Sequence, residues 1–75
     1  MKITVKLIGP LIYEAGFSEK DMTLHGGMTA GELSARVKID RQRPTIITRN
    51  GKAAAHDEAL EDGDRVVISP LYSGG

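Results

Sequence analysis

The chain has 75 residues, of which 40% are hydrophobic and 27% charged, a composition typical of one small globular domain. Ten basic and ten acidic side chains cancel, so the excess of Lys and Arg that nucleic-acid binders need is missing. No apolar run approaches the roughly 20 residues of a membrane helix or forms a signal-peptide core. We therefore expect a cytoplasmic protein that binds neither nucleic acid nor membranes. Cysteine is absent, which excludes disulfides and thiolate chemistry on side chains.

The N-terminal segment predicts two strands joined by a loop. Residues 1–7 alternate between polar and apolar side chains, which is typical of a half-buried strand, and Gly9-Pro10 ends it. We expect residues 11–20 to form an irregular loop. Residues 21–25 alternate again and predict the second strand.

One helix is predicted in the middle of the chain. Thr29 and Glu32 have the spacing of a capping box, in which each side chain accepts the backbone N–H of the other residue. Leu33 and Val37 follow at positions i and i+4 and predict the buried stripe of a short helix. Pro44 prevents the helix from continuing.

The C-terminal half predicts a hairpin and a final strand. Residues 45–49 are β-branched, residues 50–51 are Asn-Gly, and residues 52–55 return as a short strand, which indicates a type I′ hairpin. Residues 62–64, Asp-Gly-Asp, predict a tight turn before a last strand over residues 65–69. The predicted fold is therefore α+β, with one helix packed on one face of a mixed sheet of four to five strands.

The charged segments and histidines do not suggest a catalytic or metal site. Basic side chains gather at residues 36–49 and acidic ones at residues 57–64, and we interpret both as solvated surfaces, the acidic one with some capacity to attract a basic partner. His25 and His56 lack the spacing of metal ligands, and no serine has a recognisable triad partner. The chain is therefore not predicted to be a complete enzyme.

The most informative segment is the end of the chain, which reads Pro70-Leu71-Tyr72-Ser73-Gly74-Gly75. We expect a folded domain over residues 1–69 and a flexible tail over residues 70–75 that reaches about 20 Å when extended. Pro70 stiffens the exit, Leu71 and Tyr72 offer apolar contacts to a partner, and Ser73 offers a hydrogen bond. The alternative is that Leu71 and Tyr72 fold back onto the domain.

The last two residues, Gly74 and Gly75, carry no side chains. A carboxylate on such an end can enter a narrow channel in another protein and reach its active site. Gly75 is therefore the candidate reactive residue, and the rest of the tail is the candidate segment for a partner's tunnel.

The sequence resembles the MoaD/ThiS family of ubiquitin-like sulfur carriers, and molybdopterin-synthase small subunits in particular. The resemblance rests on the pattern L-x-D-G-D-x-V-x-I-x-P from Leu60 to Pro70, followed by Gly-Gly at residues 74–75. The first strand, the helix after Thr29 and the Asn-Gly hairpin agree with it. The resemblance implies a β-grasp fold with the first and last strands parallel at the centre of the sheet.

The resemblance also implies a chemistry. An adenylyltransferase acts as the activating enzyme and uses ATP to adenylylate the Gly75 carboxylate, and a sulfurtransferase then delivers persulfide sulfur to form a thiocarboxylate. A larger synthase subunit receives this sulfur in molybdopterin biosynthesis, the route to the molybdenum or tungsten cofactor. The carrier is not an enzyme and binds no cofactor, because ATP belongs to the activating partner.

Three alternatives use the same residues. In the first, the chain is a sulfur carrier for the thiazole of thiamine. In the second, it is a ubiquitin-like modifier joined through Gly75 to a lysine of a target. In the third, it is a non-catalytic interaction module whose Gly-Gly end is incidental. Removing Gly74 and Gly75 leaves function intact only in the last case.

Overall fold

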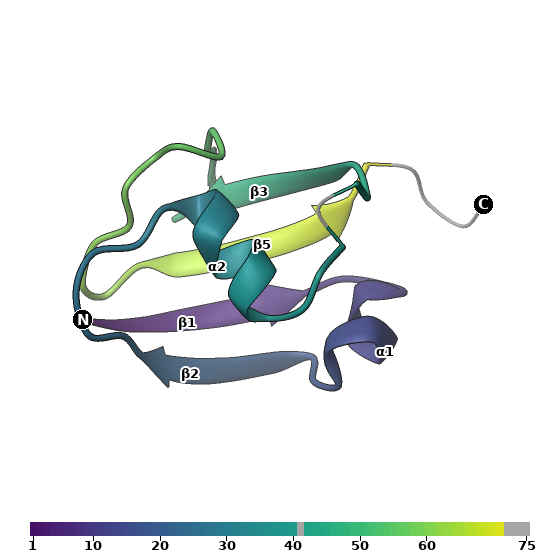
Figure 1. Ribbon diagram of the computed structural model, residues 1–75, viewed down its shortest axis with the longest axis horizontal. Coiled ribbons are helices and arrows are strands. Elements are labelled where there is room, and N and C mark those ends of the chain that lie inside the picture. The colour runs from purple at the N-terminus through teal and green to yellow at the C-terminus, as the bar shows by residue number, and fades with distance from the viewer. Residues whose placement is uncertain (41, 72–75) are drawn as a thin grey trace.

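The computed structural model describes residues 1–40 and 42–71 (Figure 1). In chain order the elements are β1 (Lys2–Leu7), α1 (Leu11–Ala15), β2 (Glu19–Thr23), α2 (Ala30–Arg36), β3 (Thr45–Arg49), β4 (Lys52–Ala53) and β5 (Arg65–Pro70). Within the described residues the strands form a five-stranded sheet in the order β2-β1-β5-β3-β4. β1 and β5 are parallel neighbours and the other pairs are antiparallel, which confirms the expected β-grasp arrangement.

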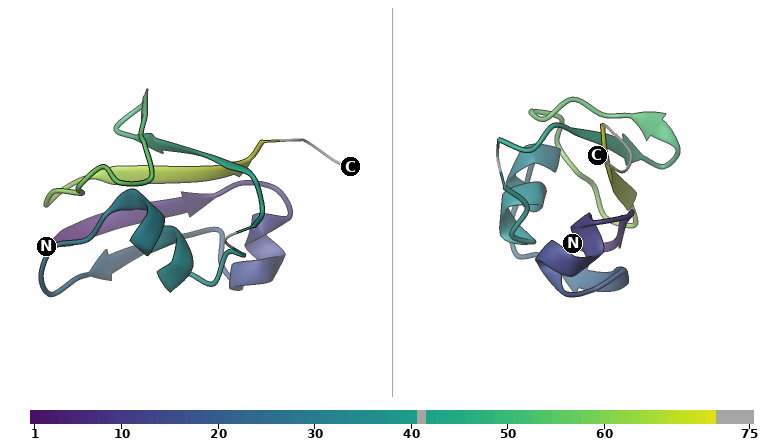
Figure 2. Two further views of the ribbon diagram at one scale, coloured as in Figure 1. Left: turned by 45° about the horizontal axis from the view of Figure 1, so that its top comes forward. Right: turned by 90° about the vertical axis from the view of Figure 1, so that its right-hand side faces the viewer.

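The core lies between α2 and the face of the sheet that this helix covers (Figures 1 and 2). Alternate residues of the two central strands point into it and are at most 1% exposed: Ile3, Val5, Leu7, Val66 and Ile68. Burial of each such side chain contributes about 1.5–3 kcal/mol. From α2 and its C-terminal end, Ala30, Leu33 and Val37 close the core, as the helical stripe predicted.

The segment predicted as an irregular loop over residues 11–20 is instead helix α1 followed by the start of β2, so the structure contains a second helix. Pro10 stands at the N-cap of α1, and Gly16 ends it with a φ of 88° while donating its N–H to Ile12 O at 2.8 Å. Leu11 is fully buried, and this burial stabilises a helix of a single turn that has no side-chain cap.

Two local predictions are confirmed by the hydrogen bonds and dihedral angles. The Thr29 hydroxyl accepts the Glu32 N–H at 3.1 Å, and the Glu32 carboxylate accepts the Thr29 N–H at 2.9 Å, which completes the capping box. Asn50 and Gly51 have φ angles of 53° and 84°, as a type I′ turn requires.

The Asp62-Gly63-Asp64 turn fastens the start of β5 to the start of β1. Asp62 Oδ1 accepts the Lys2 N–H at 2.6 Å, and Lys2 O accepts the Gly63 N–H at 2.7 Å. Gly63 adopts a φ of 86°, which favours glycine. The turn therefore fixes the parallel register that places Val5 opposite Val66, and with it the position at which β5 ends.

Candidate functional site

β5 carries the chain from the centre of the sheet to the candidate tail. Thr45 and Pro70 are register partners at the end of the β3–β5 ladder, and Leu71 donates its N–H to Pro44 O at 3.1 Å. The end of β5 therefore lies at the end of the molecule opposite the N-terminus (Figure 1). The backbone is held by the sheet up to the residue where the candidate tail begins.

β5 continues through Pro70, one residue beyond the strand end expected from the sequence. Pro70 is half-buried beside Gly9, where an added Cβ would lie 3.9 Å from the proline ring. Leu71 is 47% exposed, so about half of its side chain is open to contact with another molecule. The other candidate tail residues, Tyr72, Ser73, Gly74 and Gly75, lie outside the described residues, and their roles stay predictions.

Three exposed apolar side chains, which we call the apolar collar, surround the exit of the chain: Ile8, Ile46 and Leu71, at 39%, 42% and 47% exposure. Ile8 follows β1 and donates its N–H to Ile68 O at 3.1 Å, while Ile46 is the register partner of Ser69. Because side chains alternate along strands, Ile46, Ser69 and Leu71 share the face of the sheet that α2 does not cover. The collar is thus an apolar surface beside the point where the tail starts.

A second cluster of functional groups lies at the opposite end of β5. The buried Asp64 carboxylate accepts hydrogen bonds from Arg49 Nε at 2.5 Å, from Asn50 Nδ2 at 2.9 Å and from the Glu61 N–H at 2.7 Å. Arg49 also pairs with Glu58 at 3.1 Å and with Glu61 at 3.3 Å. This cluster joins the β3–β4 hairpin to the turn before β5 and explains why the second Asp of the Asp-Gly-Asp sequence is needed.

Burial alone would raise the pKa of Asp64, but the hydrogen bonds from Glu61, Arg49 and Asn50 outweigh burial and hold that pKa below its ordinary value. The hydrogen bond to Asp64 raises the pKa of Arg49, and Glu58 adds to this effect. Both groups are therefore charged at neutral pH. Their shifts arise from a closed structural cluster and not from an open catalytic cleft.

The acidic segment that the sequence analysis interpreted as solvated is partly internal, because Asp64 is only 4% exposed. Its residues lie before β5 and therefore at the end of the strand away from the collar. Among residues 1–40 and 42–71 no group of three or more His, Asp or Glu side chains is arranged to hold a metal ion. In the same residues, no helix has the length and hydropathy to cross a membrane.

Of the three collar residues, Leu71 was predicted from the sequence as an apolar contact, whereas Ile8 and Ile46 were not. The one local signal was the pair Ile46-Ile47 in a strand, because adjacent residues point to opposite faces and only one of them can be buried. Ile47 is 3% exposed and Ile46 is 42% exposed. Ile8 gave no signal of its own, because its place beside Ser69 depends on the β1–β5 register.

A mixed sheet with parallel central strands, helices on one side and a last strand that runs straight into an exposed end defines a ubiquitin-like β-grasp protein. The sequence matches the ThiS family over residues 5–75, and the chain belongs to this family. ThiS and MoaD proteins are small carriers, so the prediction that the chain is not an enzyme by itself agrees with the family.

Solved structures share this fold. SAMP1 from Haloferax volcanii is 27% identical with a TM-score of 0.75, and the match covers 100% of both chains. A putative molybdopterin converting factor subunit 1 from Pyrococcus furiosus is 25% identical with a TM-score of 0.79, over 96% of this chain and 99% of that one. Subunit 1 of the Helicobacter pylori molybdopterin-converting factor, solved in complex with subunit 2, is 20% identical over 100% of both chains, with a TM-score of 0.63.

Proposed function

We propose that this chain is a cytoplasmic sulfur carrier whose Gly75 carboxylate is adenylylated and converted to a thiocarboxylate that donates sulfur in molybdopterin biosynthesis. Membership of the ThiS family supports the carrier role, and the similarity to the Pyrococcus furiosus protein supports this pathway over thiamine synthesis. The observation that carries the proposal is the arrangement of the exit: β5 is held by the sheet through Pro70, and the collar lies beside the first tail residue.

The chemistry requires that the tail and the collar have separate tasks. The Gly75 carboxylate attacks the α-phosphorus of ATP in an adenylyltransferase and releases pyrophosphate, which turns a poor electrophile into an acyl adenylate. The outer sulfur of a sulfurtransferase persulfide then displaces AMP to give an acyl disulfide. A second thiol of the partner reduces that disulfide, leaving the thiocarboxylate and a protein disulfide. The collar contributes docking area outside the cleft where these steps occur.

The test is intact-protein mass spectrometry after incubation with the activating enzyme, MgATP and a persulfide donor. Conversion of the carboxylate to a thiocarboxylate replaces oxygen by sulfur and adds about 16 Da. Fragmentation must locate this gain at Gly75, and a chain lacking residues 74–75 is the matched control. Absence of the gain with an activating enzyme that modifies another carrier in parallel contradicts the proposal.

A second function, conjugation to proteins, is favoured by the 27% identity to SAMP1, a small archaeal modifier protein. The activation step is the same, but a lysine amine of a target attacks the activated Gly75 carbon in place of sulfur. Arg65 is the last basic residue of the sequence, so trypsin would leave residues 66–75 attached to the target lysine. Detection of this branched peptide in digested cell extracts supports conjugation, and its absence beside a thiolated carrier supports sulfur transfer alone.

A further inference from the structure

The outer edge of β3 is covered by its neighbour at one end only. β4 pairs Ala53 with Thr48 and Lys52 with Arg49, and Ala54 extends the contact by donating its N–H to Ile47 O at 2.8 Å. Continued in the same register, the next hydrogen-bonded pair would place His56 opposite Thr45. The chain leaves the edge before it reaches that position.

The segment after β4 turns away from the β3 edge because its carbonyl groups bind the start of α2. The first N–H groups of a helix have no partner within it, and here His56 O accepts the Gly31 N–H at 2.8 Å while Glu58 O accepts the Ala30 N–H at 2.9 Å. Gly31 permits this approach, because an added Cβ would lie 3.0 Å from His56 O. The segment after β4 therefore caps α2 and leaves the rest of the β3 edge open.

The open edge presents unpaired backbone groups. In an antiparallel strand the N–H and C=O of one residue point to the same side, and the side changes at each residue. Ile47 O points to the β4 side and Pro44 O points to Leu71, so Thr45 directs its N–H and C=O away from β5. No backbone bond joins Thr45 to another described residue on that side.

The two edges of the sheet are protected differently. The β2 edge carries alternating charges at Glu19, Lys20 and Asp21, the usual protection of a strand edge against pairing. The open part of the β3 edge, Thr45 to Ile47, has no charged residue. The open edge therefore lacks the charges that would prevent another extended chain from pairing with it.

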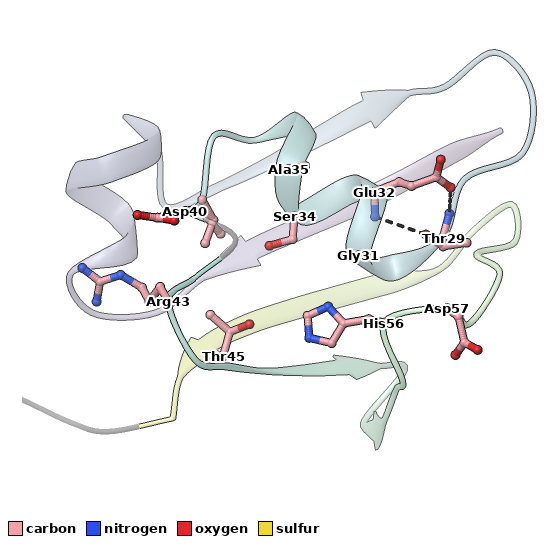
Figure 3. Close-up of a pocket in the computed structure, with 11 residues that line it drawn as sticks. Thr29, Gly31, Glu32, Ser34, Ala35, Asp40, Arg43, Thr45, His56 and Asp57 are labelled. Carbon is pink, nitrogen blue, oxygen red and sulfur yellow. Dashed lines mark hydrogen bonds between the residues drawn. The ribbon is translucent and has the colours of Figure 1, made fainter.

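A groove of about 640 Å³ lies beside this open edge, between α2 and β3 (Figure 3). Ser34 and Ala35 line it from the helix, Thr45 from the strand and His56 from the segment after β4. A strand added to β3 would direct alternate side chains into this groove.

The charges around the groove favour a basic occupant. The described lining residues supply three carboxylates, those of Glu32, Asp40 and Asp57, of which Glu32 also accepts the Thr29 N–H. They supply one guanidinium, that of Arg43, which is paired with Glu14. We propose that an extended peptide segment of a partner protein, carrying basic side chains, docks here by adding a strand to β3 at Thr45. The groove lies on the α2 side of the sheet, whereas the collar lies on the opposite face, and this docking does not depend on the fate of Gly75.

The first experiment titrates the isotope-labelled full chain with a capped hexapeptide of alternating threonine and lysine and follows the backbone amide signals. Shifts are expected at Thr45, Ile47, Gly31 and Ala35, and hydrogen exchange of the Thr45 amide should slow. The matched peptide of alternating threonine and glutamate should bind at least about tenfold more weakly. Equal binding of both peptides, or no binding at millimolar peptide, overturns the proposal.

Variants separate backbone pairing from simple charge attraction. Thr45→Pro removes the outward N–H at a strand edge that tolerates proline and should weaken binding about tenfold. Asp57→Asn should weaken it about two- to fivefold, whereas Glu61→Gln removes a carboxylate from the same acidic segment but outside the groove and should have no effect.

Three outcomes contradict the proposal. Shifts confined to residues 58–64, with Thr45→Pro binding like the parent chain, would show attraction to the acidic segment alone. Concentration-dependent dimers in sedimentation that Thr45→Pro abolishes would show that a second copy occupies the edge. Equal effects of Asp57→Asn and Glu61→Gln on binding would show that the peptide does not bind in the groove.

Discussion

Asp64 is the residue on which the end of β5 away from the tail depends. Its carboxylate accepts three hydrogen bonds from three segments. An amide at this position keeps one acceptor oxygen, but it loses the charge that pairs with Arg49 and replaces the second acceptor with an NH2 donor. We expect Asp64→Asn to lower the free energy of unfolding by about 2–3 kcal/mol in urea denaturation. Glu61→Gln is the control, because the Glu61 side chain is 76% exposed, and its effect should stay within about 0.5 kcal/mol.

The same cluster predicts a dependence of stability on pH. The pKa of Asp64 is lower in the folded chain than in the unfolded chain, so the unfolded state binds the proton first as pH falls. The stability that the charged form contributes is complete above the unfolded pKa, near 4, and is lost as pH falls through the folded pKa. The stability difference between the parent chain and Asp64→Asn should therefore shrink below about pH 4, and a constant difference would contradict this role.

Gly31 illustrates how a close contact can outweigh helix propensity. Alanine is usually favoured over glycine in a helix by about 1 kcal/mol, but a Cβ at residue 31 would lie 3.0 Å from the backbone oxygen of His56. We expect Gly31→Ala to destabilise the protein by about 1 kcal/mol, measured by thermal unfolding. Gly27→Ala, where an added Cβ meets nothing within 4 Å, should be close to neutral. A higher unfolding temperature for Gly31→Ala would show that the segment after β4 shifts at little cost to accommodate the added Cβ.

The β3–β4 hairpin combines a turn preference with a tertiary anchor, and two substitutions at Asn50 separate them. Asn50 Nδ2 donates to Asp64, and its Oδ1 accepts the Arg65 N–H at 2.8 Å. Asn50→Gly keeps the positive φ and should cost about 1–2 kcal/mol through the lost hydrogen bonds. Asn50→Ala also adds left-handed strain and should cost about 1 kcal/mol more in the same denaturation assay. Equal losses would mean that the turn bears no strain.

Elements with strong local signals could be predicted from the sequence. The capping box at Thr29 and the Asn-Gly turn are determined within a few residues, and alternation gave β1 and β5. α1 could not be found by periodicity, because it is a single turn held by the burial of Leu11. A local signal did exist, since Pro10 before the helix and Gly16 after it follow the usual asymmetry of helix ends.

The candidate site was predictable only in its chemistry. Gly-Gly after Pro70 indicated a reactive end, but the collar and the open β3 edge depend on contacts between distant segments. Ile8 and Ile46 come together because β1 and β3 both pair with β5. The acidic segment was misjudged for the same reason, since the burial of Asp64 requires Arg49 from another hairpin.

At the scale of the molecule, β5 separates the residues that stabilise the fold from those that dock on a partner. The Asp64 cluster fixes the start of β5, and the collar flanks the end of β5 about 20 Å further along the strand. Stability and docking therefore depend on different residues. Substitutions in the collar should change recognition by a partner while leaving the fold intact, which makes the docking role of this surface measurable.

Ile46→Asp tests this separation. The side chain is 42% exposed on the open face of the sheet, so the substitution should cost less than about 1 kcal/mol of stability. If the collar docks on the activating enzyme, KM for the carrier in ATP–pyrophosphate exchange should rise about tenfold or more while kcat changes little, because the tail chemistry is untouched. Lys52→Gln, at an exposed position at the other end of the hairpin, lowers the net charge by the same one unit and is the matched control. A KM that rises equally in both variants would show nonspecific charge repulsion and exclude the collar as the docking surface.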